Sequence, residues 1–405
     1  MKSTFHKILF WMHLCAGLIV GLVIAIMALT GASLSFESQL TDWADREARQ
    51  VQAPSPEAPR LSVDELLARA RAARPEAQPS GVTVYADPAS AVLVSTGREG
   101  GLYVNPYTGE VRELGAPKLR AFFHLMEEWH RWLGAQGDNR AVGRAVTGVC
   151  NTAFFFLALS GLYLWWPRKW TWRAMRPTFW FRRGLQGKAR DFNWHNVIGF
   201  WSLPVFIVLT SSGMVMSYKW ASDLVFRLTG NEPPAAQGPG GQPPVKVPEP
   251  AADARPLGME PLFAEARKQA PAWESISLRM GGGPRGNAPR GPQAMTFSIK
   301  QPRAWPLFAS AQVSLDPFTG QVLRQESYAD YNSGRKVRTW LRFLHTGQAL
   351  GWAGQLVAGL ASLGAAVLMW TGFALAWRRF RARRRTGVAA SEPSTAVPVQ
   401  PETTA

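Results

Sequence analysis

Cysteine is scarce in this chain of 405 residues, which has only Cys15 and Cys150. Both lie inside long apolar segments, so the polar segments hold no disulfide, even though an exported compartment would permit one. No CxxC or CxxCH motif occurs. Its absence argues against covalently attached haem and against thiol exchange at such a motif.

Charge is nearly absent from four segments, which lie at 8–36, 141–166, 194–218 and 352–377. A helix needs about 20 apolar residues to cross the hydrocarbon of a bilayer, so these segments predict four transmembrane helices. The first segment could instead be a signal peptide, because Lys2 and Lys7 precede it. It is too long for one, however, and no clean small-residue cleavage site follows. The predicted fold class is therefore an integral membrane α-helical protein.

Acidic residues are scarce in the segments that flank these helices. Residues 1–8, 167–193 and 378–405 together hold 16 basic and three acidic residues. The long segments are more balanced: 37–140 has 12 basic and 15 acidic residues, and 219–351 has 16 and 10. The positive-inside rule places both termini and the loop at 167–193 in the cytoplasm and the two long segments on the exported side.

Most of the net charge of +17 is thus a topology signal, and no nucleic-acid partner is expected. RRFRARRR at 378–385 follows the fourth span directly, where a basic cluster usually contacts anionic lipid. The remainder of the tail to residue 405 is expected to be disordered.

The two long segments show the same order of elements. Apolar residues at helical spacing predict a helix at 61–74 and another at 261–269. Short strands are expected after each helix, at 81–88, 91–97 and 100–114 in the first segment and at 276–280, 295–300 and 309–325 in the second. This order predicts two periplasmic α+β domains. Pro/Gly-rich stretches at 231–256 and 281–293 predict loops in the second domain.

A phrase recurs near the end of each long segment, VNPYTGEV at 104–111 and LDPFTGQV at 315–322. Proline and a Thr-Gly pair stand between alternating apolar positions in both copies. This pattern is typical of a hairpin turn in which glycine supplies an unusual backbone angle. The repeated phrase is therefore interpreted as structural.

The membrane segments repeat as well. His13 and His195 each precede a hydroxyl–glycine pair, and the interval from histidine to glycine is 18 residues in both spans. The second and fourth spans contain Ser160-Gly161 and Thr371-Gly372, each with tryptophan five residues after the glycine. The chain therefore predicts an internal duplication of helix, exported domain and helix, in parallel orientation.

Four of the six histidines lie at the ends of the spans. His13 and His195 are expected near the cytoplasmic side, whereas His130 and His345 just precede the second and fourth spans. Matched histidines would pair across the pseudo-twofold axis, and two facing imidazoles in an apolar bundle suit the axial positions of a haem iron. We expect two haem b groups, with these four histidines as ligands. Other metals, a proton relay and purely structural histidines are the alternatives.

Several further residues are candidates for the site. Arginine binds carboxylates through two parallel hydrogen bonds, so haem propionates could be held by Arg131, Arg144, Arg338 and Arg342. His124 could line a substrate site or replace His130 as a ligand. His6 lies on the same helical face as His13, but position 188 of the other half is lysine. No catalytic side chain is expected beyond the haems.

The motifs WHNVIGFW at 194–201, SGLYLWWPR at 160–168 and LHTGQALGWAGQ at 344–355, within the duplicated arrangement, resemble the PepSY-associated transmembrane family over nearly the whole chain. The resemblance implies PepSY-like exported domains and haem ligation by the four histidines. Members of the family include inner-membrane reductases of ferric siderophores. The activity expected is therefore transmembrane reduction of a periplasmic ferric siderophore, which releases Fe(II).

Electrons would pass from a donor to the haem at His13 and His195, then to the haem at His130 and His345. At about 1.5 Å of helix rise per residue, the irons would lie roughly 15–20 Å apart. No flavin or nicotinamide site is apparent, so a quinol or a cytoplasmic flavoprotein must supply the electrons. The alternatives are a non-enzymatic binding or inhibitory protein, electron transfer to another periplasmic acceptor, and a permease component.

Overall fold

The computed structural model describes residues 4–391, apart from 56, 98–99, 168–169, 235–244, 252, 271 and 281–291. Much of the two predicted Pro/Gly-rich loops, and the predicted disordered tail from 392 onward, lie outside the described residues. Contacts divide the chain into two units, each treated separately. The bundle unit comprises Met1–Leu29, Val149–Ile207 and Ala361–Ala405, and the sheet unit comprises Thr30–Gly148 and Val208–Leu360.

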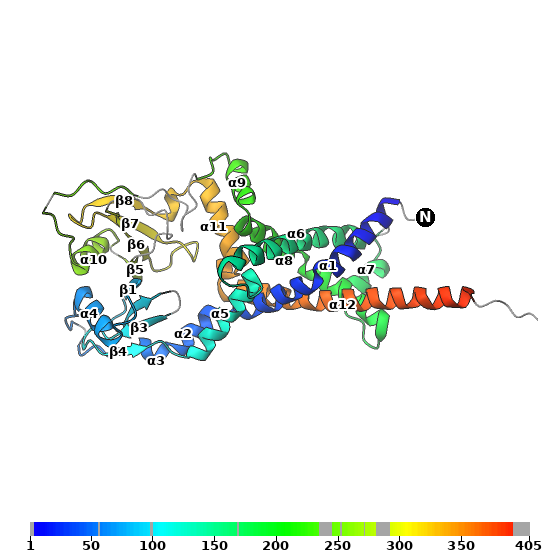
Figure 1. Cartoon of the computed structure of the whole chain (residues 1–405), viewed down its shortest axis with the longest axis horizontal. Helices are drawn as coiled ribbons and strands as arrows, with labels where there is room; N and C mark the ends of the chain where they lie inside the picture. Colours follow the sequence, from blue (N-terminus) through cyan, green and yellow to red (C-terminus); the bar gives the residue numbers. More distant parts are fainter. Residues whose placement is uncertain are drawn as a thin grey trace, which may run out of the picture. The chain divides into compact units, whose positions relative to one another are not determined.

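Four helices are long and apolar enough to cross a membrane (Figure 1). They are α1 (Thr4–Leu34), α6 (Arg140–Trp165), α8 (Gly187–Ser217) and α12 (Gly351–Ser391). Each contains one of the predicted spans almost completely, but α8 begins before residue 194 and α12 continues beyond residue 377. Lysine and arginine are good helix formers. The end of an apolar stretch therefore marks where charge begins, and the helix itself runs on.

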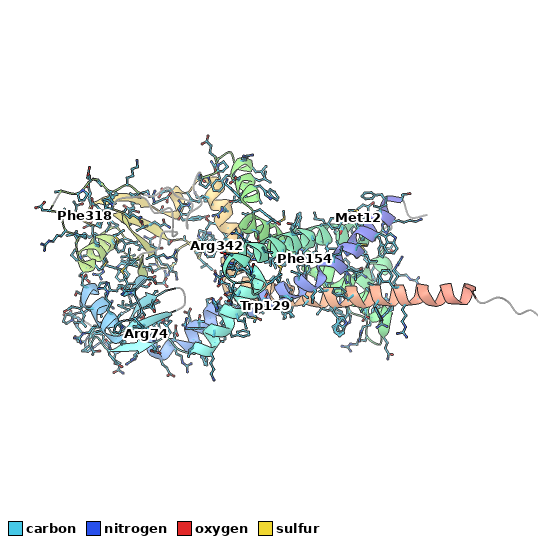
Figure 2. All side chains as sticks on the ribbon, viewed as in Figure 1. Met12, Arg74, Trp129, Phe154, Phe318 and Arg342 are labelled. Carbon is cyan, nitrogen blue, oxygen red and sulfur yellow. The ribbon has the colours of Figure 1, made fainter. Side chains whose placement is uncertain are left out.

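Apolar side chains from all four long helices form the core of the bundle unit. Val20 and Ile24 of α1 lie in one buried cluster with Leu157 of α6, Phe206 of α8 and Leu368 of α12. The ring of Phe154, labelled in Figure 2, lies 5.0 Å from that of Phe206. Lipid chains are as apolar as these side chains, so between membrane helices it is the van der Waals contact of close packing that stabilises the bundle.

The sheet unit contains eight antiparallel strands. They are β1 (Gly81–Tyr85), β2 (Val92–Thr96), β3 (Gly100–Val104), β4 (Val111–Glu113), β5 (Ser275–Arg279), β6 (Met295–Lys300), β7 (Ala311–Leu315) and β8 (Val322–Glu326). Their order is β4-β3-β2-β1-β5-β6-β7-β8. Gly81 lies opposite Arg279 and Tyr85 opposite Ser275. The strands expected in two domains therefore form one sheet, which the sequence analysis did not foresee.

Two helices cover the apolar face of this sheet, α4 (Val63–Ala73) and α10 (Met259–Lys268), and both contribute to its buried core. Each helix caps the other. Asp64 accepts hydrogen bonds from the backbone N–H groups of Met259 and Glu260 at 2.8 and 2.9 Å, and Glu260 accepts one from Val63 at 2.8 Å. A carboxylate near a helix N-terminus satisfies otherwise unpaired donors and interacts favourably with the helix dipole. Reciprocal capping therefore joins the two halves of the sheet unit.

Shorter helices complete the chain. They are α2 (Glu37–Ala44), α3 (Arg46–Arg49), α5 (Pro117–Trp132), α7 (Trp172–Phe179), α9 (Lys219–Leu228) and α11 (Ser333–His345), with 3-10 turns η1 (Gly137–Asn139), η2 (Tyr328–Asp330) and η3 (Gln348–Leu350). The helices α5 and α11 contain two of the candidate site histidines. They precede α6 and α12 in the chain and carry His130 and His345.

The repeated phrase forms the same turn twice. Asn105 Oδ1 accepts hydrogen bonds from the N–H groups of Tyr107 and Thr108, and Asp316 Oδ1 accepts them from the equivalent Phe318 and Thr319. Glycine follows in both turns, Gly109 and Gly320, with φ of 74° and 73°. Positive φ favours glycine because it has no Cβ.

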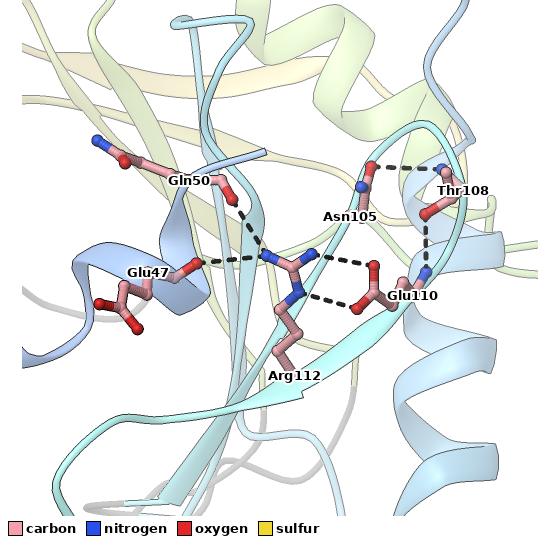
Figure 3. A network of polar contacts seen from close by, with 6 residues as sticks. All are labelled: Glu47, Gln50, Asn105, Thr108, Glu110 and Arg112. Carbon is pink, nitrogen blue, oxygen red and sulfur yellow. Dashed lines mark hydrogen bonds and ion pairs between the residues drawn. The ribbon is translucent and has the colours of Figure 1, made fainter. Parts of the chain in front are cut away.

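The first turn also leads into a polar network (Figure 3). Arg112 forms two bonds with the carboxylate of Glu110 and donates to the carbonyl oxygens of Glu47 and Gln50. Phe318, in the second turn, is labelled in Figure 2. The contacts of both turns are consistent with the structural interpretation of the phrase.

Candidate functional site

Two histidines lie in the bundle unit, and we call them the first pair. His13 is on α1 and His195 is on α8. Each ring bonds a hydroxyl from a neighbouring helix: His13 Nδ1 is 2.8 Å from Ser160 Oγ of α6, and His195 Nδ1 is 3.0 Å from Thr371 Oγ1 of α12. The two imidazoles are close enough to interact electrostatically. Residues from four different helices therefore meet around the first pair.

Hydrogen bonding assigns the ring nitrogens of the first pair. Ser160 and Thr371 donate their hydroxyl hydrogens to the carbonyls of Phe156 and Val367, at 2.7 and 2.9 Å. Their oxygens then accept from the histidines, so Nδ1 carries the hydrogen and Nε2 keeps its lone pair. A neutral imidazole with a fixed Nδ1–H and an available Nε2 is the form that ligates metals.

The second pair lies in the sheet unit and follows the same rule. His130 Nδ1, on α5, is 3.2 Å from Thr30 Oγ1, and His345 Nδ1, on α11, is 3.0 Å from Ser212 Oγ. His345 Nδ1 also lies 3.0 Å from the carbonyl oxygen of Leu209. A carbonyl can only accept, so the proton of His345 is on Nδ1. Burial, and then the nearby His130, lower the pKa of His345 to about 4, so its ring is neutral at pH 7.

The spacing within the second pair fits two ligands on opposite sides of one metal ion. The ring centroids of His130 and His345 are 6.3 Å apart, with an interplanar angle of 62°. A metal–imidazole bond is about 2 Å long and a ring nitrogen lies about 1 Å from its ring centre, which predicts about 6 Å between the centroids. The distance between the two rings is therefore compatible with both imidazoles binding one metal ion.

Glycines line the first pair. A Cβ built on Gly161 would lie 3.5 Å from His13 Cε1, and one on Gly372 would lie 3.8 Å from His195 Cε1. Gly17 and Gly199 lie one turn after the two histidines, and a Cβ on either would meet one neighbouring atom, at 4.0 or 3.8 Å. The helices therefore present no side chain beside the imidazoles at these four positions.

Among the described residues, no group of three or more His, Cys, Asp or Glu side chains could hold a metal ion. A structural zinc site needs about four protein donors. A haem needs at most two, because the porphyrin supplies the other four. The donor set in the described part of the chain therefore fits haem better than a metal bound by protein alone.

The four candidate arginines differ in their contacts. Arg131 is engaged by Glu127 at 2.6 Å, and Arg144 donates to the carbonyls of Met216 and Ser217 at the end of α8. On α11, Arg338 donates to Ser222 Oγ at 3.0 Å, while Arg342 (labelled in Figure 2) lies over the Phe343 ring.

Positions 338, 342 and 345 share one face of α11. Burial and the Arg342 charge lower the pKa of Arg338. Among the described residues, neither arginine forms an ion pair with an acid, so Arg338 and Arg342 are the better candidates for holding propionates.

His124 and His6 lie apart from these pairs. His124 Nε2 is 3.8 Å from Glu128 Oε1, and this buried carboxylate is bonded by Arg140 at 2.9 Å. His6 contacts Tyr163, with 6.3 Å between the ring centroids. The structure brings neither residue into the contacts described for the histidine pairs.

Sequence reasoning found the histidines but missed the role of the residues that orient them. Every hydroxyl partner belongs to a hydroxyl–glycine dipeptide, and each of the four long helices contributes one of these partners. These partners are Thr30, Ser160, Ser212 and Thr371. The dipeptides were noticed only as signs of repetition. Their recurrence in all four long helices was the signal that could have revealed this role.

Four long apolar helices and an antiparallel sheet define a multi-pass membrane protein with a β-containing part. The model of the PepSY-associated TM region matches residues 10–379, and the chain belongs to this family. A search of curated proteins finds no match.

Proposed function

We propose that this protein is a di-haem b electron-transfer protein of the bacterial inner membrane, which reduces a periplasmic ferric siderophore and releases Fe(II) for uptake. The observation that carries the proposal is the shared geometry of the four histidines. Each Nδ1 bonds a hydroxyl of a hydroxyl–glycine dipeptide, and the rings of the second pair are 6.3 Å apart. Fixed imidazoles in facing pairs suit axial haem ligation.

The residues that would hold the cofactors are His13 and His195 for one haem b, and His130 and His345 for the other. When bound, these groups would supply one-electron redox chemistry. Arg338 and Arg342 would bind propionate carboxylates through charge-assisted hydrogen bonds. The four hydroxyl groups hold the imidazole planes, and those of Ser160, Ser212 and Thr371 also keep the proton on Nδ1. The apolar helices keep water away from the first pair, which favours electron transfer over side reactions.

The direction of transfer follows from charge. The basic flanks put the first pair on the cytoplasmic side and the second pair on the periplasmic side. In this arrangement the two halves of the eight-stranded sheet, with α4 and α10, are PepSY-like regions produced by duplication, and they lie in the periplasm. The substrate is ferric iron held by the hard oxygen ligands of a siderophore. On gaining one electron the iron becomes the softer Fe(II), which such ligands hold less tightly.

A haem assay tests the proposal directly. Detergent-purified protein, analysed as its pyridine haemochrome, should contain two haem b per chain. His13→Ala and His345→Ala should each reduce the content to about one, whereas His124→Ala is the matched control and should retain two. Anaerobic addition of a ferric siderophore should then reoxidise the reduced protein, with Fe(II) trapped by a chromogenic chelator.

Two results would redirect the assignment. Protein without haem, produced with ample haem supply, would contradict the reductase and favour a PepSY-type binding or inhibitory role. Protein with two haems that ferric siderophores do not reoxidise would favour another periplasmic acceptor.

A further inference from the structure

The electron donor is the component that the proposed function leaves open, and the bundle unit contains an unassigned pair of polar rings beside the first histidine pair. His6 precedes His13 by seven residues, so both lie on one face of α1. Tyr163 follows Ser160, the partner of His13, by three residues and lies on the same face of α6. The His6 and Tyr163 rings are 6.3 Å apart, at an angle of 43°. They form a second contact between α1 and α6, about 10 Å along α1 from His13.

This pair lies beside an exposed apolar surface. Phe5, Ile8 and Met12 of α1 are 58%, 53% and 51% exposed, and Tyr163 itself is 46% exposed. Met12 is labelled in Figure 2. Phe5 packs edge-on against Tyr163 at 5.4 Å. On a helix long enough to cross a membrane, such a stripe faces lipid, so a molecule dissolved in the bilayer can reach the two rings without crossing the bundle.

The other half of the chain lacks this pair. In the frame that aligns His13 with His195, the counterpart of His6 is Lys188. In the frame that aligns Ser160 with Thr371, the counterpart of Tyr163 is Ala374. The polar contact is therefore an addition to one half and is not required by the duplicated scaffold. The His6–Tyr163 pair therefore suits a partner that binds only beside α1 and α6.

We propose that His6 and Tyr163 form the binding site for a lipid-soluble hydroquinone, which is the electron donor; this inference rests on the proposed function. An imidazole accepts a hydrogen bond from one ring hydroxyl, a phenol donates to the oxygen it faces, and Phe5 provides an aromatic edge for the ring. A water-soluble flavoprotein would instead dock on the polar flanks of the helices. An apolar approach leading to a base and a phenol favours the hydroquinone.

The reaction balances as follows. The hydroquinone loses two electrons and two protons and becomes the quinone. Each electron leaves singly toward the redox centre at His13 and His195, and two ferric ions are reduced for each hydroquinone consumed. The His6 imidazole takes a proton from the hydroxyl that it faces and passes it to the cytoplasm. The second proton leaves by the same route after the second electron.

Binding is tested with a probe that does not require haem. The fluorescent quinol analogue 2-heptyl-4-hydroxyquinoline N-oxide is titrated into nanodiscs that contain the wild-type chain, with and without haem. Saturable quenching at about one site per chain is expected in both. His6→Ala and Tyr163→Phe should weaken binding about tenfold or more, and Tyr163→Phe retains the ring that packs on Phe5. Lys7→Ala, the neighbouring position on a different face of α1, is the control and should bind as the wild type does.

Electron transfer is then followed by anaerobic stopped flow with decylubiquinol. His6→Asn retains a hydrogen-bonding side chain without the base, so it should bind the analogue and yet be reduced at least tenfold more slowly. Dithionite should reduce every variant equally. Absent or unsaturable binding to haem-loaded wild type overturns the inference, as does equal reduction of wild type and His6→Asn by the quinol. Protein that binds the analogue but never haem overturns the proposed function while the site stands.

Discussion

The helices α5 and α11 hold equivalent histidines in different electrostatic surroundings. On α5, positive and negative side chains are paired: Arg131 bonds Glu127, and Arg140 bonds the buried Glu128. On α11 every charged residue is basic, and Arg338 and Arg342 on the His345 face have no acidic partner among the described residues. The hydroxyl–imidazole contacts nonetheless match. The hydroxyl contacts of the two histidines are therefore alike, while the charges around them differ.

The corners after these helices should show the largest difference. Gly347, after α11, has φ of 74°, and an added Cβ would lie 2.6 Å from the Gln355 Cα. Gly134, after α5, has a similar φ, but its added Cβ would meet the Trp129 ring at 3.1 Å. The backbone at Gln355 cannot move away from an added Cβ as readily as the Trp129 side chain can. We expect Gly347→Ala to reduce the free energy of unfolding by about 2–4 kcal/mol and Gly134→Ala by about 1 kcal/mol.

Thermal unfolding of the two glycine variants in detergent, with wild type alongside, measures this difference. Equal losses of stability would show that the α11 corner relaxes as easily as the α5 corner. Backbone packing would then not distinguish the two corners.

The arginines give the next largest effect. Arg338→Gln combined with Arg342→Gln should weaken retention of the second haem about 10- to 100-fold, because a hydrogen bond to a charged group contributes about 1.5–3 kcal/mol. Arg131→Gln should change retention little, since Glu127 already engages that side chain. The rate of haem transfer to apomyoglobin, followed by absorbance, measures how strongly each variant retains haem relative to the wild type. A larger loss in Arg131→Gln would place the propionates against α5 instead.

The hydroxyl partners extend the comparison to the first pair. Ser160→Ala should weaken haem binding at His13 about tenfold, the lower end of the range for lost ligand-orienting contacts. Ser212→Ala should weaken haem binding at His345 only a few-fold, because the Leu209 carbonyl still accepts a hydrogen bond from His345 Nδ1. Resonance Raman spectra and haem titrations of the two variants would test this order, and a larger loss at Ser212 would contradict it.

The repeated turns should show the smallest effect. Asn105 and Asp316 make the same two contacts through a single side-chain oxygen. Asn105→Asp and Asp316→Asn should therefore each change the free energy of unfolding by less than about 0.5 kcal/mol. Chemical denaturation of the variants provides the measurement. A loss of several kcal/mol in either would show that the amide or the charge has a role outside the turn.

Patterns of residue type predicted much of this structure. The near absence of charge predicted the four long helices, and alternating apolar residues predicted the strands that follow α4 and α10. Such signals depend on local spacing alone. The ends of α8 and α12 were missed because lysine and arginine continue a helix that has left the apolar segment.

Long-range contacts could not be predicted in this way. Nothing within 81–85 or 275–279 specifies that these strands pair, or that Asp64 caps α10. The histidines were identifiable because they are rare and recur in matching frames. The partners of Arg131 and Arg338 depend on side chains brought together from distant segments, so the four arginines could be told apart only in three dimensions.

The pairing of β1 with β5 has a consequence for biosynthesis. The ribosome completes β1 long before β5, and α5, α6 and α8 are all made in between. Until β5 arrives, β1 has an unpaired edge, and an open strand edge is a template for pairing with other chains. The nascent first half is therefore an aggregation-prone intermediate. The interval between insertion of the first and second halves then sets how long this edge must be protected.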